Sequence, residues 1–240
     1  MRIALASARF INRNITFNLG QIDRYMREAK AQGAELACFG ETFLQGFHAM
    51  TWDYARDRQV AVTTDSELFQ GLCRRTEELG IDLLFGFVER EGESLYSSCA
   101  LLGGGRLLHL YRRISEGWKE YWKTDGHYRE GETVEVFSYR GKRCLIALCG
   151  DLWDFPERFR LGQDLLLWPV YVNVTPEEWQ EHYLSEYARQ ASLACADTLL
   201  INSVTTMPGE VCYGGCFRFL DGAVKVLLPP GEEGLLIVEV

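Results

Sequence analysis

The sequence predicts an α/β protein, because segments with the patterns of strands and helices alternate along most of its 240 residues. Two stretches, 18–32 and 65–79, place apolar residues at three- and four-residue steps, and each is followed by a glycine, Gly33 or Gly80, of the kind that ends a helix. Short apolar runs around them are typical of buried strands. No Pro/Ser-rich linker or change of composition divides the chain. Residues 1–240 are therefore expected to form one domain with one sizeable core.

Turn residues and apolar runs predict the remaining elements. The glycines of Gly103-Gly-Gly105 supply the positive φ angles of a hairpin, and Arg140-Gly141 marks a second hairpin. A long helix is expected over 176–196, which opens with Pro-Glu-Glu. The C-terminal part turns at Asp221-Gly222 and again at 229–231. The expected strands are residues 2–7, 35–40, 81–88, 95–102, 106–112, 133–139, 142–148, 165–168 and 198–203, with three more between 211 and 240.

Charge and hydropathy exclude several classes of partner. The formal net charge of −9 argues against nucleic acids and anionic membranes. No apolar run approaches the length needed to cross a bilayer. The apolar part of the segment 1–7 is too short for a signal peptide, so a first strand is expected there. Without an export signal, the eight cysteines are interpreted as reduced thiols, which indicates a cytoplasmic protein.

The spacing of Cys212 and Cys216 suggests a metal site, but the ligand set is incomplete. Three residues separate these cysteines, and no second cysteine pair or nearby histidine completes a tetrahedral set. The four histidines are scattered along the chain. We therefore expect no metal.

A cysteine at the end of a buried strand is the strongest functional signal in the chain. Cys149 directly follows the apolar run 144–148, and the residues after it predict a turn and a short helix. Backbone N–H groups and the positive end of a helix dipole at such a place favour a thiolate, which is a nucleophile. A buried cysteine without chemistry is the alternative, because cysteine is among the most often buried residue types.

Two other expected strand ends carry charges that suit the same chemistry. The strand over 35–40 delivers Glu41, and the strand over 106–112 is followed by Arg113. A carboxylate, a cation and a thiol can serve as general base, oxyanion stabiliser and nucleophile. We therefore expect these two residues to meet Cys149.

These segments resemble the motifs of the nitrilase superfamily of carbon–nitrogen hydrolases, whose catalytic set is a glutamate, a lysine and a cysteine. The glutamate motif is similar to Glu41-Thr-Phe-Leu-Gln-Gly-Phe47, and the lysine motif, Tyr-Arg-Lys after a Gly-rich hairpin, is similar to the segment 103–113. The tail 231–240 resembles the family's closing strand. The cysteine motif is matched by Cys149, Asp151, Trp153, Pro156 and Glu157. The resemblance implies a four-layer αββα sandwich of the nitrilase type and a homodimer.

One position departs from the family pattern. Where the family has its catalytic lysine, this chain has Arg113, and the nearest lysines are Lys119 and Lys123. Three explanations are open. The arginine takes over the oxyanion role, the following loop brings Lys119 into the site, or the protein no longer hydrolyses amides.

Further residues are expected around the nucleophile. The family places a second glutamate after its lysine. Glu116 and Glu120 both follow Arg113, and the spacing of Glu120 is the more similar to that of the family, with an exposed loop charge as the alternative. The backbone N–H of Gly150 is expected to share the oxyanion with the cation. Trp153, Tyr171 and Asn173 are expected to line the substrate pocket, because 168–173 ends a strand at the same sheet edge.

The sequence therefore predicts a thiol amidohydrolase that acts on a small linear amide or carbamoyl compound through a thioester at Cys149. No cofactor is expected, because side chains and backbone supply all the groups. One alternative is a subunit like the glutamine-hydrolysing domain of NAD synthetases, which Cys149-Gly-Asp-Leu-Trp153 resembles. Another is a binding or regulatory pseudoenzyme that keeps the fold. Nothing in the sequence favours nitrile hydrolysis.

Overall fold

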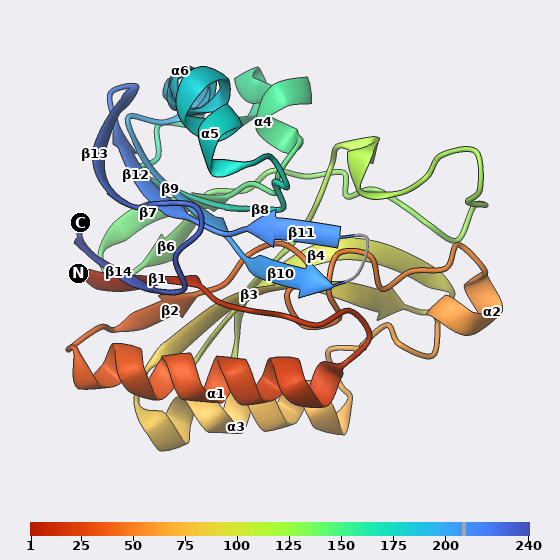
Figure 1. The fold of residues 1–240 in the computed structure, drawn as a ribbon. Coiled ribbons are helices and arrows are strands. Elements are labelled where there is room, and N and C mark those ends of the chain that lie inside the picture. Colours follow the sequence, from red (N-terminus) through yellow and green to blue (C-terminus); the bar gives the residue numbers. More distant parts are fainter. Residues whose placement is uncertain (208–209) are drawn as a thin grey trace.

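Two six-stranded sheets face each other in the computed structural model, which describes residues 1–207 and 210–240 (Figure 1). The first sheet has the strand order β14-β1-β2-β3-β4-β5. Its central strands β1, β2 and β3 are parallel, and β4, β5 and β14 are added in antiparallel pairs. Its strands are β1 (Arg2–Ser7), β2 (Leu36–Cys38), β3 (Asp82–Glu91), β4 (Ser94–Gly103), β5 (Arg106–Arg112) and β14 (Gly234–Glu239).

The second sheet repeats this plan with the order β13-β12-β9-β8-β7-β6. Strands β7, β8 and β9 are parallel, and the outer strands pair with them in antiparallel fashion. A separate two-stranded hairpin joins β10 to β11. The strands are β6 (Phe137–Tyr139), β7 (Lys142–Ile146), β8 (Leu165–Val170), β9 (Asp197–Asn202), β10 (Val204–Met207), β11 (Glu210–Tyr213), β12 (Cys216–Leu220) and β13 (Ala223–Leu228).

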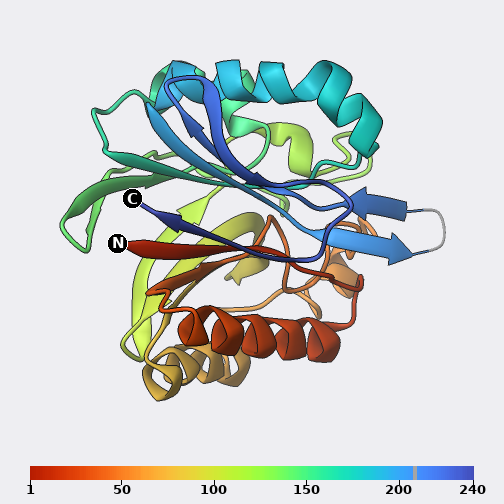
Figure 2. The same ribbon diagram turned by 60° about the vertical axis from the view of Figure 1, so that its left-hand side comes forward.

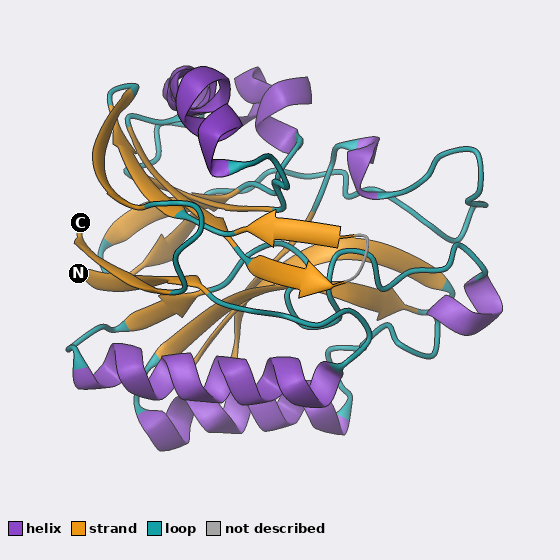
Figure 3. Ribbon diagram, in the orientation of Figure 1, coloured by secondary structure: helices purple, strands orange, loops and turns teal. Residues whose placement is uncertain are grey.

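Helices cover the outer face of each sheet. Figure 3 shows α1 and α3 beneath the first sheet and α4, α5 and α6 above the second, and the turned view in Figure 2 shows the same four layers. The four-layer αββα sandwich is therefore confirmed. Among the described residues, no helix combines the length and apolar character that a membrane span requires. The helices are α1 (Ile15–Ala31), α2 (Tyr54–Asp57), α3 (Glu67–Leu79), α4 (Asp151–Asp154), α5 (Pro176–Glu178) and α6 (Leu184–Ala194), with 3₁₀ turns at Glu116–Trp118 and Pro156–Phe159.

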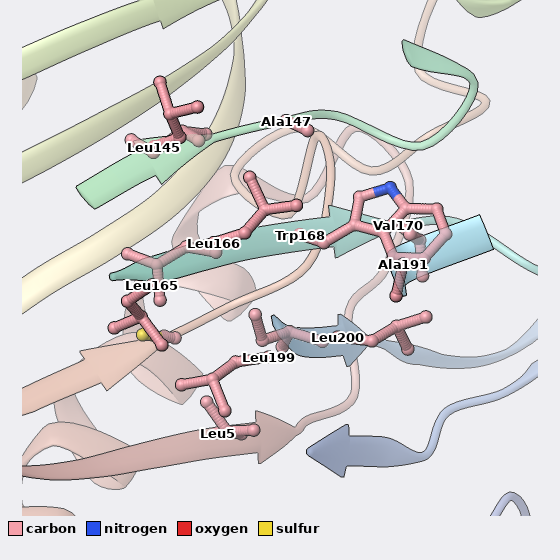
Figure 4. Close-up of a cluster of buried hydrophobic side chains, with 14 of the residues drawn as sticks. Leu5, Leu145, Ala147, Leu165, Leu166, Trp168, Val170, Ala191, Leu199 and Leu200 are labelled. Carbon is pink, nitrogen blue, oxygen red and sulfur yellow. The ribbon is translucent and has the colours of Figure 1, made fainter. Parts of the chain in front are cut away.

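The alternation of side chains along β1 explains the two apolar layers. Ile3 and Leu5 point into the core between the sheets, whereas Ala4 and Ala6 point towards α1 and α3. Figure 4 shows Leu5 in the same cluster as Leu199 of the opposite sheet. Both faces of this strand are buried, which is why the segment is apolar without interruption.

Most predicted elements are present, and the differences have local causes. The predicted helix 176–196 is broken by a π-helical stretch, Trp179–Tyr183, between α5 and α6. The predicted strand 133–139 pairs with β7 only over its last three residues. The hairpin of β10 and β11 was not predicted as such, because a single residue, Ser203, separates β10 from β9.

Gly86 in β3 determines how the segment that carries Glu41 crosses the first sheet. A Cβ atom at this position would lie 2.7 Å from the carbonyl oxygen of Gly40 and 2.8 Å from the carbonyl carbon of Glu41. The Gly86 N–H donates to the Gly40 carbonyl at 3.2 Å, and the Leu44 N–H donates to the Gly86 carbonyl at 3.1 Å. The backbone of this segment therefore packs directly on β3.

We expect Gly86→Ala to lower the free energy of unfolding by about 1–3 kcal/mol, because the added methyl group meets backbone atoms that have little room to move. The matched control is Gly20→Ala on α1, where no atom lies within 4 Å of the added Cβ. Helix propensity predicts a gain of about 0.5–1 kcal/mol for that control. Urea unfolding measures both changes, and a stabilising effect of Gly86→Ala would contradict the close packing.

Candidate active site

Three strand ends deliver the candidate catalytic side chains to one place. Glu41 lies three residues after β2, Arg113 directly follows β5, and Cys149 lies three residues after β7. The first two come from one sheet and the cysteine comes from the other. The site is thus built between the two sheets at the ends of their strands.

Cys149 sits in a sharp turn of the backbone between β7 and α4. Its φ angle is +40°, a left-handed conformation that is uncommon for a residue with a side chain. The Cys149 N–H donates to the Pro169 carbonyl at 3.0 Å, and the Trp168 indole N–H donates to the Cys149 carbonyl at 3.0 Å. These two bonds from the β8 segment hold the turn in its strained form. The predicted short helix is present as a single turn, α4.

Asp151 ties this turn to the segment that carries Arg113. One of its carboxylate oxygens, Oδ2, accepts from the Leu148 N–H at 2.8 Å and from the Tyr111 hydroxyl at 2.7 Å. The other, Oδ1, accepts from the N–H groups of Ile114 and Ser115 at 3.1 and 2.9 Å. Asp151 is fully buried, and burial raises its pKa although these donors favour the carboxylate. Its role in the structure is to connect the two halves of the site.

Glu41 and Arg113 form an ion pair that is almost completely removed from water. They are 1% and 3% exposed, and Nη1 of the arginine lies 2.8 Å from Oε1 of the glutamate. The Ser97 hydroxyl donates to the same oxygen at 3.1 Å, and Nε of Arg113 donates to the Ser115 hydroxyl at 2.7 Å. Burial is the largest single influence on Arg113 and opposes its charge, but the negative groups around it, Glu41 first among them, together outweigh burial, so that the arginine pKa is raised.

One atom on each side of the pair has no partner. Oε2 of Glu41 is buried and accepts no hydrogen bond from any described residue. The described hydrogen bonds of Arg113 use Nε and Nη1, which leaves Nη2 without an acceptor in the described part of the chain. The site therefore presents a free acceptor and a free donor.

The thiol of Cys149 is neutral in this environment, which corrects the expectation of a depressed pKa. Burial, followed by the charge of Glu41, raises the pKa of the thiol to about 12, and the opposing charge of Arg113 does not compensate. The sulfur lies 3.7 Å from the Tyr171 carbonyl oxygen. Cys149 is partly exposed, whereas the other seven cysteines are buried. Exposure to solvent therefore distinguishes Cys149 from the other cysteines, whereas the protonation state of its thiol does not.

The alternative cation and the predicted second glutamate lie elsewhere. Nζ of Lys119 donates to the Tyr128 carbonyl at 2.7 Å and pairs with Glu130 at 2.7 Å, so it fastens its own loop. Glu120 is partly exposed and pairs with Lys123 at 2.7 Å, not with Arg113. Glu120 is therefore a charge on the loop, which was the alternative to a second glutamate in the site. The structure brings Arg113, and not Lys119, to the glutamate.

The predicted pocket residues separate into two groups. Gly150 and Tyr171 adjoin the cysteine, and no described residue accepts the Gly150 N–H. Trp153 instead packs edge-on against Tyr187, with ring centres 5.0 Å apart. Asn173 is exposed and makes no described contact with Glu41, Arg113 or Cys149, which does not support a place in the pocket.

An aromatic wall is built around the side chain of Tyr171, whose backbone carbonyl meets the Cys149 sulfur. The rings of Phe47 and Tyr171 stack with centres 4.1 Å apart, and His48 meets Tyr171 edge-on at 5.5 Å. The Tyr171 hydroxyl donates to Glu210 at 2.6 Å, which ties this wall to the hairpin of β10 and β11. Phe47 follows Glu41 by six residues in the same loop after β2, so one segment carries both the carboxylate and part of the wall.

Sequence reasoning did not identify three of the supporting residues. Ser97 lies in the middle of β4 among other small residues, and nothing in its local pattern indicates a contact with Glu41. Ser115 follows Arg113 by two residues, which was the one available signal. Trp168 lies in an apolar strand that indicates burial, and it is buried, but its indole N–H also donates to the Cys149 carbonyl.

Neither a described metal cluster nor a described cavity coincides with this site. No group of three or more His, Cys, Asp or Glu residues within 1–207 and 210–240 has the arrangement of a metal site. A surface cavity of about 480 Å³ lies along β5 and includes His109 and Glu135, away from Cys149. The polar groups, not a cavity, identify the site.

Known proteins resemble this chain in sequence. The family model for carbon-nitrogen hydrolases matches residues 2–240. The N-carbamoylputrescine amidase of Arabidopsis thaliana is 25% identical over 178 residues, which are 69% of this chain and 57% of that protein. A glutamine-dependent NAD(+) synthetase of Thermotoga maritima is 24% identical over 154 residues, which are 64% of this chain and 26% of that protein. The chain thus spans less than two thirds of these relatives.

Solved structures share the fold over the whole chain. An amidase from Nesterenkonia sp. AN1, with acrylamide added at its active-site cysteine, has a TM-score of 0.81 and 24% identity, covering 100% of this chain and 93% of that one. The glutamine-dependent NAD+ synthetase from Acinetobacter baumannii has a TM-score of 0.79 and 22% identity, covering 98% of this chain and 44% of that one. Because the family model extends over nearly every residue, the chain belongs to the carbon-nitrogen hydrolase family, in the nitrilase superfamily that its motifs predicted.

Proposed function

We propose that the protein hydrolyses the C–N bond of a small linear amide or carbamoyl compound through a thioester at Cys149. The observation that carries this proposal is the buried Glu41–Arg113 pair beside the thiol, with Oε2 and Nη2 left without partners. Attack by a thiol on a carbonyl needs an acceptor for the proton of the sulfur and a donor for the oxygen that becomes charged. Both groups are present next to one accessible cysteine.

The reaction proceeds in two halves with Glu41 as the proton carrier. Oε2 takes the thiol proton as the sulfur bonds to the carbonyl carbon, and the carbonyl electron pair moves onto oxygen. Nη2 of Arg113 and the Gly150 N–H hold that oxyanion. The oxyanion then collapses, the C–N bond breaks, and Glu41 returns the proton to the departing ammonia or amine. A water molecule, deprotonated by the same carboxylate, releases the acid and restores the thiol.

The properties of the Arg113 guanidinium and of the Cys149 thiol support this division of roles. A guanidinium keeps its protons throughout the physiological range, so Arg113 stabilises charge but does not transfer protons. A thiol with a pKa of about 12 is not deprotonated before the substrate binds, so a base must act during the attack. Glu41 is the base that the geometry offers.

A second candidate is an ammonia-producing glutamine amidase that serves another protein. The structural match to the Acinetobacter baumannii synthetase covers 98% of this chain but 44% of that protein, so this chain corresponds to one part of it. The Cys-Gly-Asp-Leu-Trp segment resembles the glutamine-hydrolysing domains as well. In this case the ATP-dependent step belongs to a partner.

The assembly and location of the protein also belong to the proposal. The resemblance to the family supports a homodimer. The eight cysteines are all free thiols, which supports a reducing compartment such as the cytoplasm. Small-molecule amides are the expected substrates.

The direct test is the mass of Cys149 after brief incubation with a panel of amides, including glutamine, followed by an acid quench. We expect release of ammonia or amine, together with a mass increase at Cys149 equal to the acyl group. The control is Cys149→Ala, which has no sulfur to acylate and is expected to lose turnover. Turnover that survives this substitution would exclude the thioester, and binding without turnover by the wild type would favour the pseudoenzyme.

A pair of substitutions decides which cation stabilises the oxyanion. We expect Arg113→Ala to lower kcat on the order of 10²-fold or more, as for loss of an oxyanion donor. Lys119→Ala should have a much smaller effect, because its ammonium is bound to Tyr128 and Glu130. Thermal unfolding of both variants is recorded, since the arginine variant leaves the Glu41 charge buried without its partner. The opposite ranking would move the role to Lys119, and full turnover by both would refute the assigned triad.

The expected pH dependence of kcat/KM follows from the raised pKa values of the Cys149 thiol and the Arg113 guanidinium. Between about pH 7 and 10, we expect kcat/KM to show no decline, because the thiol and the guanidinium both keep their protons over that range. A lysine in the cation's place would begin to lose its proton near the upper limit, at about 10.4. The measurement is a pH series of kcat/KM, with circular dichroism over the same range as the control for folding. A decline with a midpoint below about 9 would contradict the neutral resting thiol.

A further inference from the structure

The guanidinium of Arg113 occupies a space that two glycines leave open. A Cβ atom at Gly117 would lie 3.0 Å from Nη2, and one at Gly150 would lie 2.6 Å from the same nitrogen. Gly150 has a φ angle of −64°, and Gly117 is not among the residues with positive φ, so neither backbone conformation requires glycine. What both positions require is the absence of a side chain next to Nη2.

A serine fixes the other end of the same group. The Ser115 hydroxyl accepts from Nε of Arg113 at 2.7 Å, and its own N–H donates to Asp151 at 2.9 Å. Ser115 is fully buried. With Nε bound to this serine and Nη1 bound to Glu41, the planar fork has one orientation, and Nη2 points into the gap between the glycines.

We propose that Ser115, Gly117 and Gly150 form a guanidinium cradle, a set of positioning residues that places Nη2 of Arg113 at the oxyanion opposite the Gly150 N–H. The assignment of Nη2 to the oxyanion rests on the proposed function. The arrangement is specific for arginine, because Ser115, Glu41 and the gap between the two glycines each take a different nitrogen: Nε, Nη1 and Nη2. A lysine at this position has one nitrogen and leaves two of the three places empty.

The cradle predicts that a methyl group at position 117 acts only through Arg113. The experiment is a double-mutant cycle of Gly117→Ala and Arg113→Lys, with two measurements on each variant. The first is kcat on the amide that the wild type hydrolyses. The second is the rate at which iodoacetamide modifies Cys149, which needs no substrate and depends on the arginine charge beside the thiol. Gly126→Ala is the control, since it lies in the same loop with nothing within 4 Å of the added Cβ.

In the background that keeps Arg113, we expect Gly117→Ala to lower kcat by roughly 10- to 100-fold with KM nearly unchanged. The reason is that displacing an oxyanion donor by about 1 Å weakens its contact in the transition state. Modification of Cys149 should slow as well. Combined with Arg113→Lys, the same alanine should have almost no further effect on either rate. Gly126→Ala should leave both rates at the wild-type value.

Equal losses from Gly117→Ala in both backgrounds would show a general effect on the loop and overturn the cradle, as would an equal loss from Gly126→Ala. If the wild type hydrolyses no amide, the proposed function fails, and the coupling in the modification rates alone then supports or overturns the cradle. If Gly117→Ala does not fold, the cycle is repeated with Ser115→Ala. That variant removes the acceptor of Nε and must show the same coupling to Arg113→Lys.

Discussion

The buried ion pair of Glu41 and Arg113 is the constraint on which the rest of the site depends. Two charges that are 1% and 3% exposed have lost nearly all contact with water, at a cost of several kcal/mol for each ion. Their mutual contact offsets this cost only with further hydrogen bonds, which Ser97 and Ser115 provide. The pair still keeps one free oxygen and one free nitrogen, and in a dry site these act strongly on a bound substrate.

The scaffold holds this pair against the nucleophile by contacts that reach across the two sheets. Asp151 accepts from the Cys149 turn on one side and from the Arg113 segment on the other, so neither moves independently. Left-handed backbone at Cys149 and at Thr42, the residue after Glu41, is unfavourable by about 1–3 kcal/mol each. Such strain persists because the surroundings, including Gly86 and Trp168, permit no easier conformation.

Arg113 differs in its chemistry from the lysine that the resemblance to the nitrilase motifs implies at this position. Its fork binds Glu41 and Ser115 at the same time and still has a nitrogen to offer, which a single ammonium does not. It also keeps its charge at all working pH values, so in the proposed mechanism all proton transfers fall to Glu41. A neutral thiol, a permanent cation and one carboxylate form a consistent set for that mechanism, since each has a single task in the proposed attack.

The sequence by itself determined the alternation of strands and helices and the identity of the three strand-end residues, because periodicity, turn glycines and short motifs are local properties of the chain. The four layers were implied only by the resemblance of those motifs to the nitrilase superfamily. It did not determine which cation meets Glu41, the place of Glu120, the contact of Ser97 or the charge of the thiol. Those depend on residues far apart in sequence, such as Arg113 and Glu41, which are 72 positions apart. Whether Lys119 turns to the site or to Glu130 is decided by the packing of its loop. Burial, which raises the thiol pKa, exists only once both sheets have closed over the cysteine.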